Sequence, residues 1–279
     1  MGLFALIKRK VILGRGSSKF EIGDNVLLVD RKGRRAVFSL KPGRVFSSHL
    51  GPVSHDDFVG LPKGTRLKLP GGSVVTVLSP TLADQVLGMP RGAQVIYPKD
   101  LGSILIFGDI NQGCRVLEAG VGSGALSMAM LSVGATVVGY EIREDFANRA
   151  QKNVVSHLGP DTEYSVELRD IYNGIDGTFD RIVLDLPEPW RVVEHARRAL
   201  KLGGIFVSYL PTIGQVETLR RELDVVDALM FKNVDTFETL MRSWHIEGQS
   251  TRPDHRMVAH TGFITTARLV GQPERWLVP

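Results

Sequence analysis

The sequence predicts an α/β protein: a small β-rich N-terminal domain over residues 1–80, then a doubly wound parallel sheet over residues 81–279. Two observations carry this prediction. Short apolar runs separated by Gly- and Pro-containing turns fill the first eighty residues, a pattern typical of a small barrel or sandwich. After Cys114, apolar strands alternate with helical patterns, the order that builds a parallel sheet from βαβ units.

Composition agrees with a folded chain and excludes several classes of protein. Hydrophobic residues make up 43% of the 279 residues and charged residues 23%, which excludes disordered, collagen-like and coiled-coil proteins. The single cysteine excludes an intramolecular disulfide framework and a multi-cysteine metal site. No apolar run reaches the roughly 18 residues that cross a bilayer, and no secretory signal pattern is present. We therefore expect a cytoplasmic protein with no membrane partner.

Charge is distributed unevenly along the chain. Residues 1–70 contain 14 Lys or Arg but only 5 Asp or Glu, whereas the whole chain has a formal net charge of +4. A basic front on a mildly acidic body suggests a polyanionic partner such as nucleic acid. A solvated basic surface without a partner is an equally good interpretation of charge alone.

The basic front contains a predicted hairpin. Apolar runs at 26–30 and 36–40 flank a turn with Gly at its centre, and such a pair is typical of two antiparallel strands. The tip is a candidate for phosphate contacts, which position a nucleic acid without reading its sequence. Its four basic residues are Arg31, Lys32, Arg34 and Arg35.

The remaining elements follow from local periodicity and turn residues. We expect, in chain order, a strand at 74–78, helices at 81–87 and 98–107, a strand at 116–119, a helix at 125–132, a strand at 136–140, a helix at 143–158 and strands at 164–168 and 181–184. There follow a helix at about 190–200 ended by Gly203-Gly204, a strand at 205–210, a helix at 215–223 and strands at about 233–246 and 261–270.

A glycine-rich loop joins the first strand of this sheet to its helix, and glycines there let the backbone approach a ligand. The spacing is G-x-G-x-G rather than the G-x-G-x-x-G of dinucleotide enzymes. An acid precedes the loop, which disfavours a diphosphate but suits the sulfonium and amino group of S-adenosyl-L-methionine (AdoMet). The expected contacts are Glu118, Gly120, Gly122, Ser123, Gly124, Ala125 and Leu126.

Acids also follow the second and third strands. Glu141 lies about 20 residues past the loop, where a carboxylate can accept both hydroxyls of an adenosine ribose. Its alternative role is a favourable charge at the next helix N-terminus. Asp170 can accept the adenine amino group, although alone it is equally typical of a surface loop.

Asp185 ends the fourth strand, in the segment Asp-Leu-Pro-Glu-Pro-Trp at 185–190. Parallel sheets bind ligands at the carboxyl ends of their strands, so we expect Asp185 to face the transferred methyl group. The alternative is a cap of the helix that Pro189 opens. A carboxylate facing an adenine can hold the N6 amine and stabilise the cation formed by N1 methylation, or remove the N6 proton as general base. The sequence leaves both roles open.

Five segments occur in an order that is typical of one family. They are Ser-His-Asp-Asp at 54–57 with Gly60, Gln-Val-Ile-Tyr-Pro-Lys-Asp at 94–100, the glycine loop at 116–126, the turn at 184–190 and His-Thr-Gly-Phe at 260–263. The glycine loop is common to many methyltransferases, whereas the other segments are more specific. Together they resemble the tRNA (adenine-58-N1)-methyltransferase family of bacteria and archaea, over most of the chain.

The resemblance implies a class I (Rossmann-like) AdoMet methyltransferase fold with a small N-terminal β-domain. It implies a homotetramer that methylates N1 of adenosine 58 in the T-loop of tRNA. Some archaeal members also act at position 57, and the sequence leaves that range open. A lone Cys114, expected to be buried, argues against the inter-subunit disulfides of thermophilic archaeal members.

The resemblance also assigns residues. Asp185 matches the catalytic aspartate and also contacts AdoMet, as does Gln94. Glu141 and Asp170 match the ribose and adenine acids. Tyr97 and Tyr209 fall where active-site tyrosines of the family lie. Tyr209, at the end of a strand, is independently suited to stack on a base drawn out of its helix.

Other functions remain as alternatives. The chain could be a catalytically silent tRNA-binding subunit, although such subunits have degenerate cofactor loops. It could instead methylate another RNA. No metal is expected, because His245, His255 and His260 lie on separate segments without a second cysteine or a carboxylate cluster.

Overall fold

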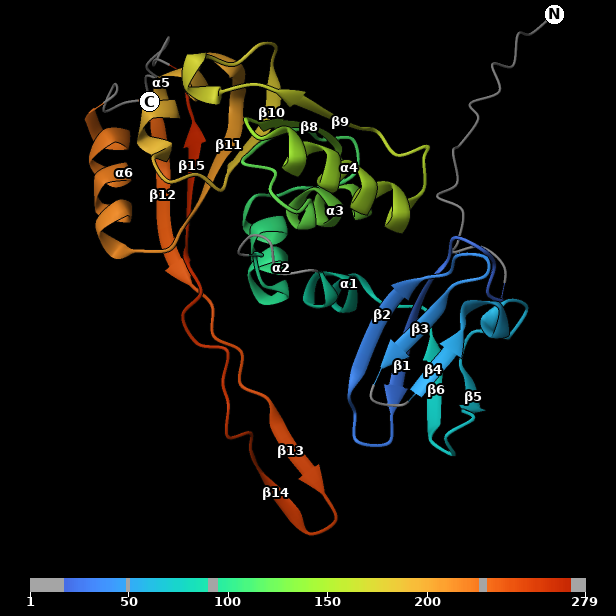
Figure 1. Ribbon diagram of the computed structural model, residues 1–279. Coiled ribbons are helices and arrows are strands. Elements are labelled where there is room, and N and C mark those ends of the chain that lie inside the picture. Colours follow the sequence, from blue (N-terminus) through green and yellow to red (C-terminus); the bar gives the residue numbers. More distant parts are fainter. Residues whose placement is uncertain (1–17, 49–50, 90–94, 226–229, 272–279) are drawn as a thin grey trace, which may run out of the picture. The chain divides into compact units, whose positions relative to one another are not determined.

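The computed structural model describes residues 18–48, 51–89, 95–225 and 230–271 (Figure 1). The chain divides into two compact units, Met1–Asp84 and Gln85–Pro279, and each is described by itself. Among the helices of the described residues, none has the length and apolar character that a membrane span requires.

The first unit contains a four-stranded antiparallel sheet with the strand order β2-β1-β6-β5. Its strands are β1 (Asn25–Asp30), β2 (Arg35–Ser39), β5 (Thr65–Lys68) and β6 (Val74–Leu78). A separate hairpin of β3 (Val45–Ser48) and β4 (Gly51–Ser54) leads into the short helix η1 (His55–Phe58). Phe20, Leu28 and Phe58 belong to a buried apolar core of this unit.

The predicted basic hairpin is confirmed as β1 and β2. The Asp30 carboxylate accepts hydrogen bonds from the backbone nitrogens of Lys32 and Arg34, at 2.8 and 2.9 Å. Gly33 takes a φ of +73°, which glycine adopts without steric cost. The acid at the end of β1 therefore organises the turn that carries the basic residues.

The second unit contains a seven-stranded sheet with the order β12-β15-β11-β10-β7-β8-β9. Its strands are β7 (Arg115–Ala119), β8 (Thr136–Glu141), β9 (Tyr164–Leu168), β10 (Phe179–Leu184), β11 (Leu200–Leu210), β12 (Phe231–Glu238) and β15 (Phe263–Leu269). Strands β7 to β11 pair in parallel, and β15 runs antiparallel to both of its neighbours. The predicted α/β class is confirmed.

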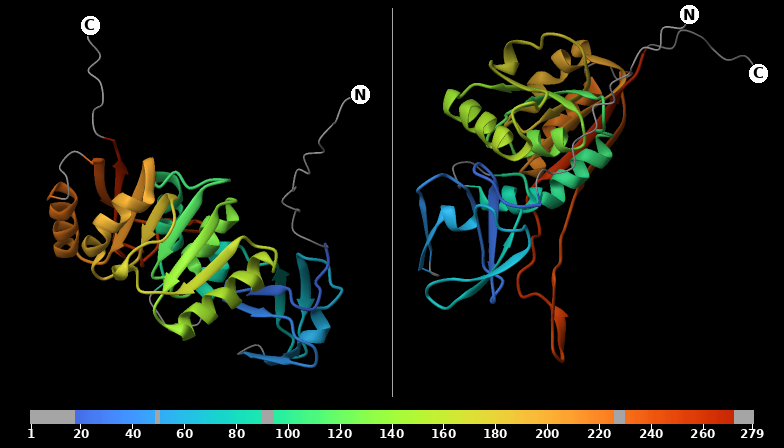
Figure 2. Two further views of the ribbon diagram at one scale, coloured as in Figure 1. Left: turned by 90° about the horizontal axis from the view of Figure 1, so that it is seen from above. Right: turned by 90° about the vertical axis from the view of Figure 1, so that its right-hand side faces the viewer.

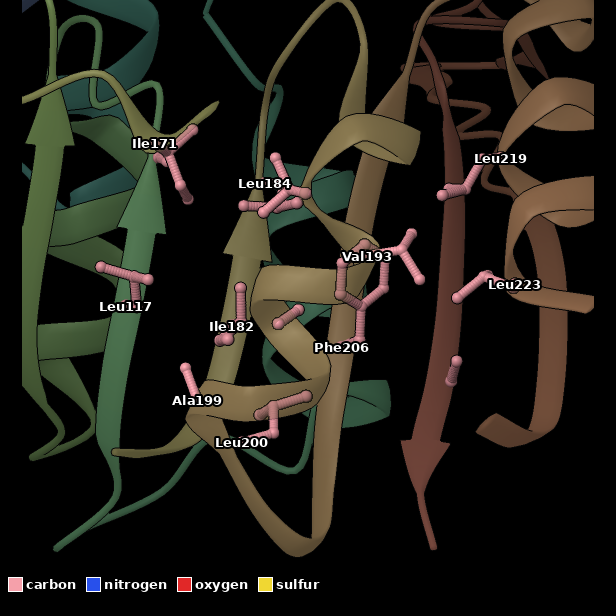
Figure 3. Close-up of a cluster of buried hydrophobic side chains, with 14 of the residues drawn as sticks. Leu117, Ile171, Ile182, Leu184, Val193, Ala199, Leu200, Phe206, Leu219 and Leu223 are labelled. Atoms are coloured by element: carbon pink, nitrogen blue, oxygen red, sulfur yellow. The ribbon is translucent and has the colours of Figure 1, made fainter. Parts of the chain in front are cut away.

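Helices lie on both faces of this sheet (Figure 2). They are α2 (Pro98–Phe107), α3 (Ala125–Ser132), α4 (Glu144–Leu158), α5 (Val193–Ala199) and α6 (Ile213–Val225), while α1 (Leu82–Gly88) contains the boundary between the units. One buried cluster packs Leu117, Ile182 and Phe206 of the sheet against Val193 of α5 and Leu219 of α6 (Figure 3). Side chains alternate along a strand, so the intervening buried residues face the opposite layer.

The expected helix at 190–200 is shorter than predicted. A 3-10 turn, η3 (Pro189–Val192), precedes α5, and α5 ends at Ala199 rather than at the glycine pair. Leu200 already pairs with Phe179 of β10. Gly203 therefore lies within the span of β11, with a φ of +79°. The apolar pattern continues across the boundary, so periodicity alone could not locate it.

The expected single strand at 233–246 is wrong. Strand β12 ends at Glu238, and β13 (Trp244–Glu247) pairs instead with β14 (Ser250–Pro253). These two strands form an arm that extends from the sheet (Figure 1). Trp244 and Ile246 are apolar residues two positions apart, a spacing typical of a strand, so the sequence pattern did not reveal the break. Gly248, with a φ of +56°, allows the tight turn at the tip of the arm.

Candidate active site

The site lies where the chain reverses its direction of winding across the sheet. Strands β7 and β10 are neighbours, and the connections from them lead toward opposite edges. In open α/β sheets, ligands bind outside the carboxyl ends of strands at such a point. The two loops are joined there, because the Asp185 nitrogen donates to the Ala119 oxygen at 2.7 Å.

The glycine loop is shaped by close contacts at its two ends. Gly120, Gly122 and Gly124 all have positive φ, at +32°, +55° and +81°. A Cβ on Gly120 would lie 2.6 Å from the Asp185 carbonyl oxygen, and one on Gly124 would lie 3.1 Å from Ala150 of α4. A Cβ on Gly122 would meet nothing within 4 Å. The backbone at Gly122 therefore borders open space, which a ligand can approach.

The next residues anchor the loop to α3 and α4. Ala125 begins α3, where it and Leu126 are buried. The Ser123 carbonyl accepts a hydrogen bond from the Asn153 amide of α4 at 2.9 Å. These contacts fix the path of the loop. Ala125 and Leu126 therefore pack in the interior and hold the loop in place.

Glu141 holds the middle of the loop from the end of β8. Its carboxylate accepts hydrogen bonds from the backbone nitrogens of Gly122 and Arg143, at 3.1 and 3.0 Å. The following side chain, Ile142, is 70% exposed. An exposed branched apolar side chain beside an acid offers an apolar contact for a heterocycle, and Ile142 is not among the residues that the sequence predicted for the site. The sequence pattern that could have indicated Ile142 is an apolar residue directly after the acid at the end of a strand.

Asp170 lies after β9 and caps the short helix η2 (Ile171–Asn173). One carboxylate oxygen accepts a hydrogen bond from the Tyr172 nitrogen at 2.9 Å. The structure thus shows the capping role, which still leaves the second oxygen of the carboxylate for a ligand.

Glu118 is fully buried beneath the loop. One oxygen accepts a hydrogen bond from the Ser127 hydroxyl at 2.5 Å, and Ser127 lies 3.1 Å from the Tyr164 hydroxyl. The other oxygen, Oε1, is buried with no hydrogen-bond partner. Burial raises the pKa of Glu118 to about 8, and the nearby charges of Asp185 and Glu141 raise it further against the effect of Ser127.

Asp185 differs from the other acids because its carboxylate has no hydrogen-bond partner among the described residues. Burial alone raises its pKa to about 7. Because Glu118, with a pKa of about 8, is largely protonated near pH 7, the negative charge around the loop comes from Glu141 and from the ionised form of Asp185. An unpartnered carboxylate in such a place is a candidate for direct contact with a ligand.

The two predicted tyrosines have different surroundings. Tyr97 precedes α2 and is 37% exposed, whereas Tyr209 at the end of β11 is 6% exposed. The Tyr209 hydroxyl donates to Asp100 Oδ2 at 3.3 Å. Burial raises the pKa of Tyr209, and the charges of Asp100 and Asp185 raise it further. Tyr97 can offer an open ring face, while most of Tyr209 is covered by protein.

A polar cluster lies beside Tyr209, and three of its members, Lys99, Asp100 and Thr261, occur in the segments that resemble the family. Lys99 and Asp100 at the start of α2 form a buried ion pair at 2.7 Å. Thr239 and Thr261 each donate a hydroxyl to Asp100, both at 2.6 Å. No local pattern could reveal this cluster, because its members lie as far as 162 positions apart.

The remaining predicted residues are Gln94 and the histidines that were considered as metal ligands. Gln94 lies outside the described residues. His260 faces two acceptors, with Nδ1 at 2.8 Å from a Glu238 carboxylate oxygen and Nε2 at 2.9 Å from the Pro211 carbonyl oxygen. Both contacts raise its pKa. Within the ranges that the structure describes, no group of three or more His, Cys, Asp or Glu is arranged to hold a metal.

Comparisons with known proteins agree with this geometry. A family model described as "tRNA methyltransferase complex GCD14 subunit" matches residues 73–252, and one described as "TrmI-like N-terminal" matches residues 19–66. The tRNA (adenine(57)-N(1)/adenine(58)-N(1))-methyltransferase TrmI of Methanocaldococcus jannaschii is 36% identical, over 88% of this chain and 95% of the relative. The tRNA (adenine(58)-N(1))-methyltransferase TrmI of Thermus thermophilus is 34% identical, over 87% and 96%.

Solved structures show the same fold. A SAM-dependent O-methyltransferase from Thermotoga maritima superposes with a TM-score of 0.85 at 30% identity, over 92% of this chain and 97% of that chain. The tRNA (m1A58) methyltransferase TrmI from Aquifex aeolicus superposes with a TM-score of 0.78 at 29% identity, over 91% and 100%. The sheet order, the glycine loop and the strand-end acids thus occur in a chain that belongs to the tRNA (adenine-58-N1)-methyltransferase family.

Proposed function

We propose that this chain transfers the methyl group of AdoMet to N1 of adenosine 58 in the T-loop of tRNA. The observation that carries the proposal is the Asp185 carboxylate, which lies beside the glycine loop with no hydrogen-bond partner among the described residues. Relatives with 34–36% identity are named for this reaction, and their coverage extends over most of both chains.

The residues around the glycine loop fit AdoMet, which supplies an electrophilic methyl group on a cationic sulfur. Glu141 and Asp185 favour a ligand that carries positive charge. The backbone at Gly122 borders open space, and the 70% exposed Ile142 offers an apolar face to an adenine. Glu141 would bind the ribose hydroxyls, and Asp170 the adenine amino group. Gly120, Ser123, Gly124 and Gln94 would complete the cofactor site.

Asp185 acts on the target base in this proposal. A carboxylate there accepts a hydrogen bond from the N6 amine, which holds N1 toward the methyl group. The ring gains positive charge as N1 is methylated, and a fixed carboxylate in a site of low polarity stabilises that charge as it develops. Asp185 can then also accept the N6 proton. Tyr97 offers its exposed ring for stacking on the base.

The first unit would bind the tRNA backbone through part of its basic surface. Arg34 pairs with Asp30 at 2.6 Å, and Arg35 pairs with Asp84. Arg31 and Lys32 are exposed at the same turn and form no ion pair within the described part of the chain. We therefore assign the phosphate contacts to Arg31 and Lys32 rather than to all four residues of the hairpin. The expected cytoplasmic location is consistent with a tRNA substrate.

The arm supports the proposed homotetramer. Trp244 and Ile246 are 58% and 73% exposed and lie on one face of the β13–β14 pair, opposite Pro253 and Thr251. An isolated two-stranded hairpin is marginally stable in water. Packing of this apolar face against a second copy of the chain would stabilise it.

A methyl-transfer assay on an unmodified tRNA transcript tests the proposal. Nucleosides are identified by mass spectrometry and mapped to positions 57 and 58, with Asp185→Ala beside the wild type. We expect 1-methyladenosine at position 58 and a loss of roughly 10³-fold in kcat for the variant, the scale of a lost transition-state contact. AdoMet binding without any methyl transfer to tRNA would contradict the substrate, and no AdoMet binding would favour a silent tRNA-binding subunit.

A further inference from the structure

The buried cluster around Asp100 has no role in the mechanism described so far. Lys99 Nζ and the Asp100 carboxylate have side-chain exposures of 5% and 0%. Placing two charges in the interior is strongly unfavourable unless other hydrogen bonds complete their surroundings. A buried ion pair of this kind is therefore a candidate for holding neighbouring segments in one arrangement.

Hydrogen bonds complete the surroundings of both charges. Asp100 Oδ1 accepts from Lys99 and Thr239, at 2.7 and 2.6 Å. Asp100 Oδ2 accepts from Thr261 at 2.6 Å and from Tyr209 at 3.3 Å. Lys99 Nζ also donates to the Thr239 carbonyl at 2.8 Å and to the Thr261 hydroxyl at 2.5 Å. Thr261 thus accepts from Lys99 and donates to Asp100, which closes a ring of hydrogen bonds.

The cluster joins four separate segments of the second unit. Lys99 and Asp100 start α2, Thr239 follows β12, Thr261 precedes β15, and Tyr209 lies near the end of β11. Thr239 and Thr261 are also the two points at which the chain leaves and re-enters the sheet to form the arm. A single carboxylate therefore fixes both roots of the arm and one side chain at the carboxyl end of the sheet.

Tyr209 is held on two sides. Its hydroxyl bonds to Asp100, and its ring lies against Gly262, where a Cβ would approach the ring to 2.4 Å. Only glycine at position 262 leaves room for the ring. The charge of Asp185 contributes to the raised pKa of Tyr209, so the phenol that bonds to Asp100 lies near the proposed catalytic carboxylate.

We propose that Asp100, held by Lys99, Thr239 and Thr261, is a positioning residue that fixes Tyr209 as a rigid wall of the pocket for the target adenine. Asp100 acts through the Tyr209 hydroxyl and touches neither the base nor the cofactor. This inference rests on the proposed function for its effect on methyl transfer. The rigidity of Tyr209 is a property of the free protein and can be measured without tRNA.

Thr261→Val tests the inference, because valine keeps the shape of threonine but removes the hydroxyl that links Lys99 to Asp100. We expect kcat to fall about tenfold, the scale of one net hydrogen bond, with the KM for AdoMet unchanged within about twofold. Thr261→Ser should restore most of the activity. The matched control is Thr236→Val, which removes a hydroxyl pair with Thr265 at 2.9 Å on the same two strands and should leave kcat unchanged.

A double-mutant cycle with Tyr209→Phe separates positioning from general structure. If Thr261 acts through the Tyr209 hydroxyl, its substitution should cost little further activity in the Tyr209→Phe background. Additive losses would overturn the inference, as would full activity of Thr261→Val. Should Thr261→Val fail to fold, Thr239→Val removes one hydroxyl contact each to Lys99 and Asp100 and gives the same test.

Fluorine NMR of fluorotyrosine-labelled protein provides the readout without substrate. The Tyr209 resonance is assigned from Tyr209→Phe. We expect one sharp resonance in the wild type and in Thr236→Val, and a broadened or split resonance in Thr261→Val. An unchanged resonance in Thr261→Val would overturn the inference. Absence of methyl transfer by the wild type would instead contradict the proposed function, and the resonance would still decide whether the cluster holds Tyr209.

Discussion

Asp100 is fully buried and Asp185 is half-buried, and both lie near Tyr209, yet their surroundings are opposite. Asp100 accepts four hydrogen bonds and pairs with Lys99. Asp185 accepts none from the described residues, and burial raises its pKa to about 7. A carboxylate whose charge is fully compensated by the protein serves the structure. One that the protein leaves uncompensated is available to compensate charge on a ligand.

The comparison predicts opposite effects on stability, and this is the largest effect that we expect. Asp100→Ala leaves the Lys99 ammonium buried without its partner and should lower the free energy of unfolding by about 3–5 kcal/mol. Asp185→Ala removes an uncompensated carboxylate and should leave that free energy unchanged or raise it. Urea denaturation at pH 8 measures both variants. Equal losses of stability would remove the distinction between the two acids.

Glu118 is an intermediate case between Asp100 and Asp185. It is fully buried, and only one of its two carboxylate oxygens accepts a hydrogen bond. Its pKa rises from 4.5 in the unfolded chain to about 8 in the folded protein, so the folded state holds the proton more tightly. The free energy of unfolding should therefore fall as the pH rises from about 4.5 to 8, by a few kcal/mol at most.

Glu118→Gln tests this expectation, since an amide keeps the shape and does not titrate. The variant should lose this part of the pH dependence and be more stable than the wild type at pH 8. Thermal denaturation at several pH values makes the comparison. A wild type and variant with parallel pH profiles would show that Glu118 ionises normally in the folded state.

The pH dependence of catalysis tests the carboxylate form of Asp185. A pKa of about 7 means that the protonated form prevails below that pH and the carboxylate above it. We expect kcat/KM for tRNA to fall about tenfold per pH unit below 7 and to level off above it. Asp185→Asn should have low activity without this acid limb. A flat wild-type profile between pH 5.5 and 8 would contradict the assignment.

The smallest expected effect concerns compensated and uncompensated charges on the first unit. Arg31→Ala combined with Lys32→Ala should raise the KM for tRNA several-fold at low salt. Each substitution removes a cationic side chain that forms no ion pair within the described part of the chain and is therefore available to a phosphate. Arg34→Ala is the matched control, because Arg34 already pairs with Asp30 at 2.6 Å. A larger KM effect for Arg34→Ala would reverse our assignment. Initial rates at two salt concentrations measure the difference.

Much of the fold could be predicted because its causes are local. The alternation of apolar strands with helices after Cys114, the positive-φ glycines at 120–124 and the acids at strand ends are all visible in short windows. The errors occurred where a local pattern continued across a boundary. The sequence pattern predicted that Trp244 and Ile246 belong to the strand that in fact ends at Glu238. It also predicted that Leu200 is helical, although Leu200 pairs with Phe179.

The sequence by itself determined the α/β class, the cofactor-type loop and the positions of Glu118, Glu141 and Asp185, because strand-end residues converge wherever parallel strands meet. Only the tertiary structure decided which of the acids have their negative charge balanced by hydrogen-bond donors or by a cation of the protein. Lys99, Asp100, Thr239 and Thr261 lie up to 162 positions apart and become neighbours only when α2 packs beside β15. Whether a buried carboxylate is neutralised depends on groups that approach it through space, and no local pattern of residues encodes that approach.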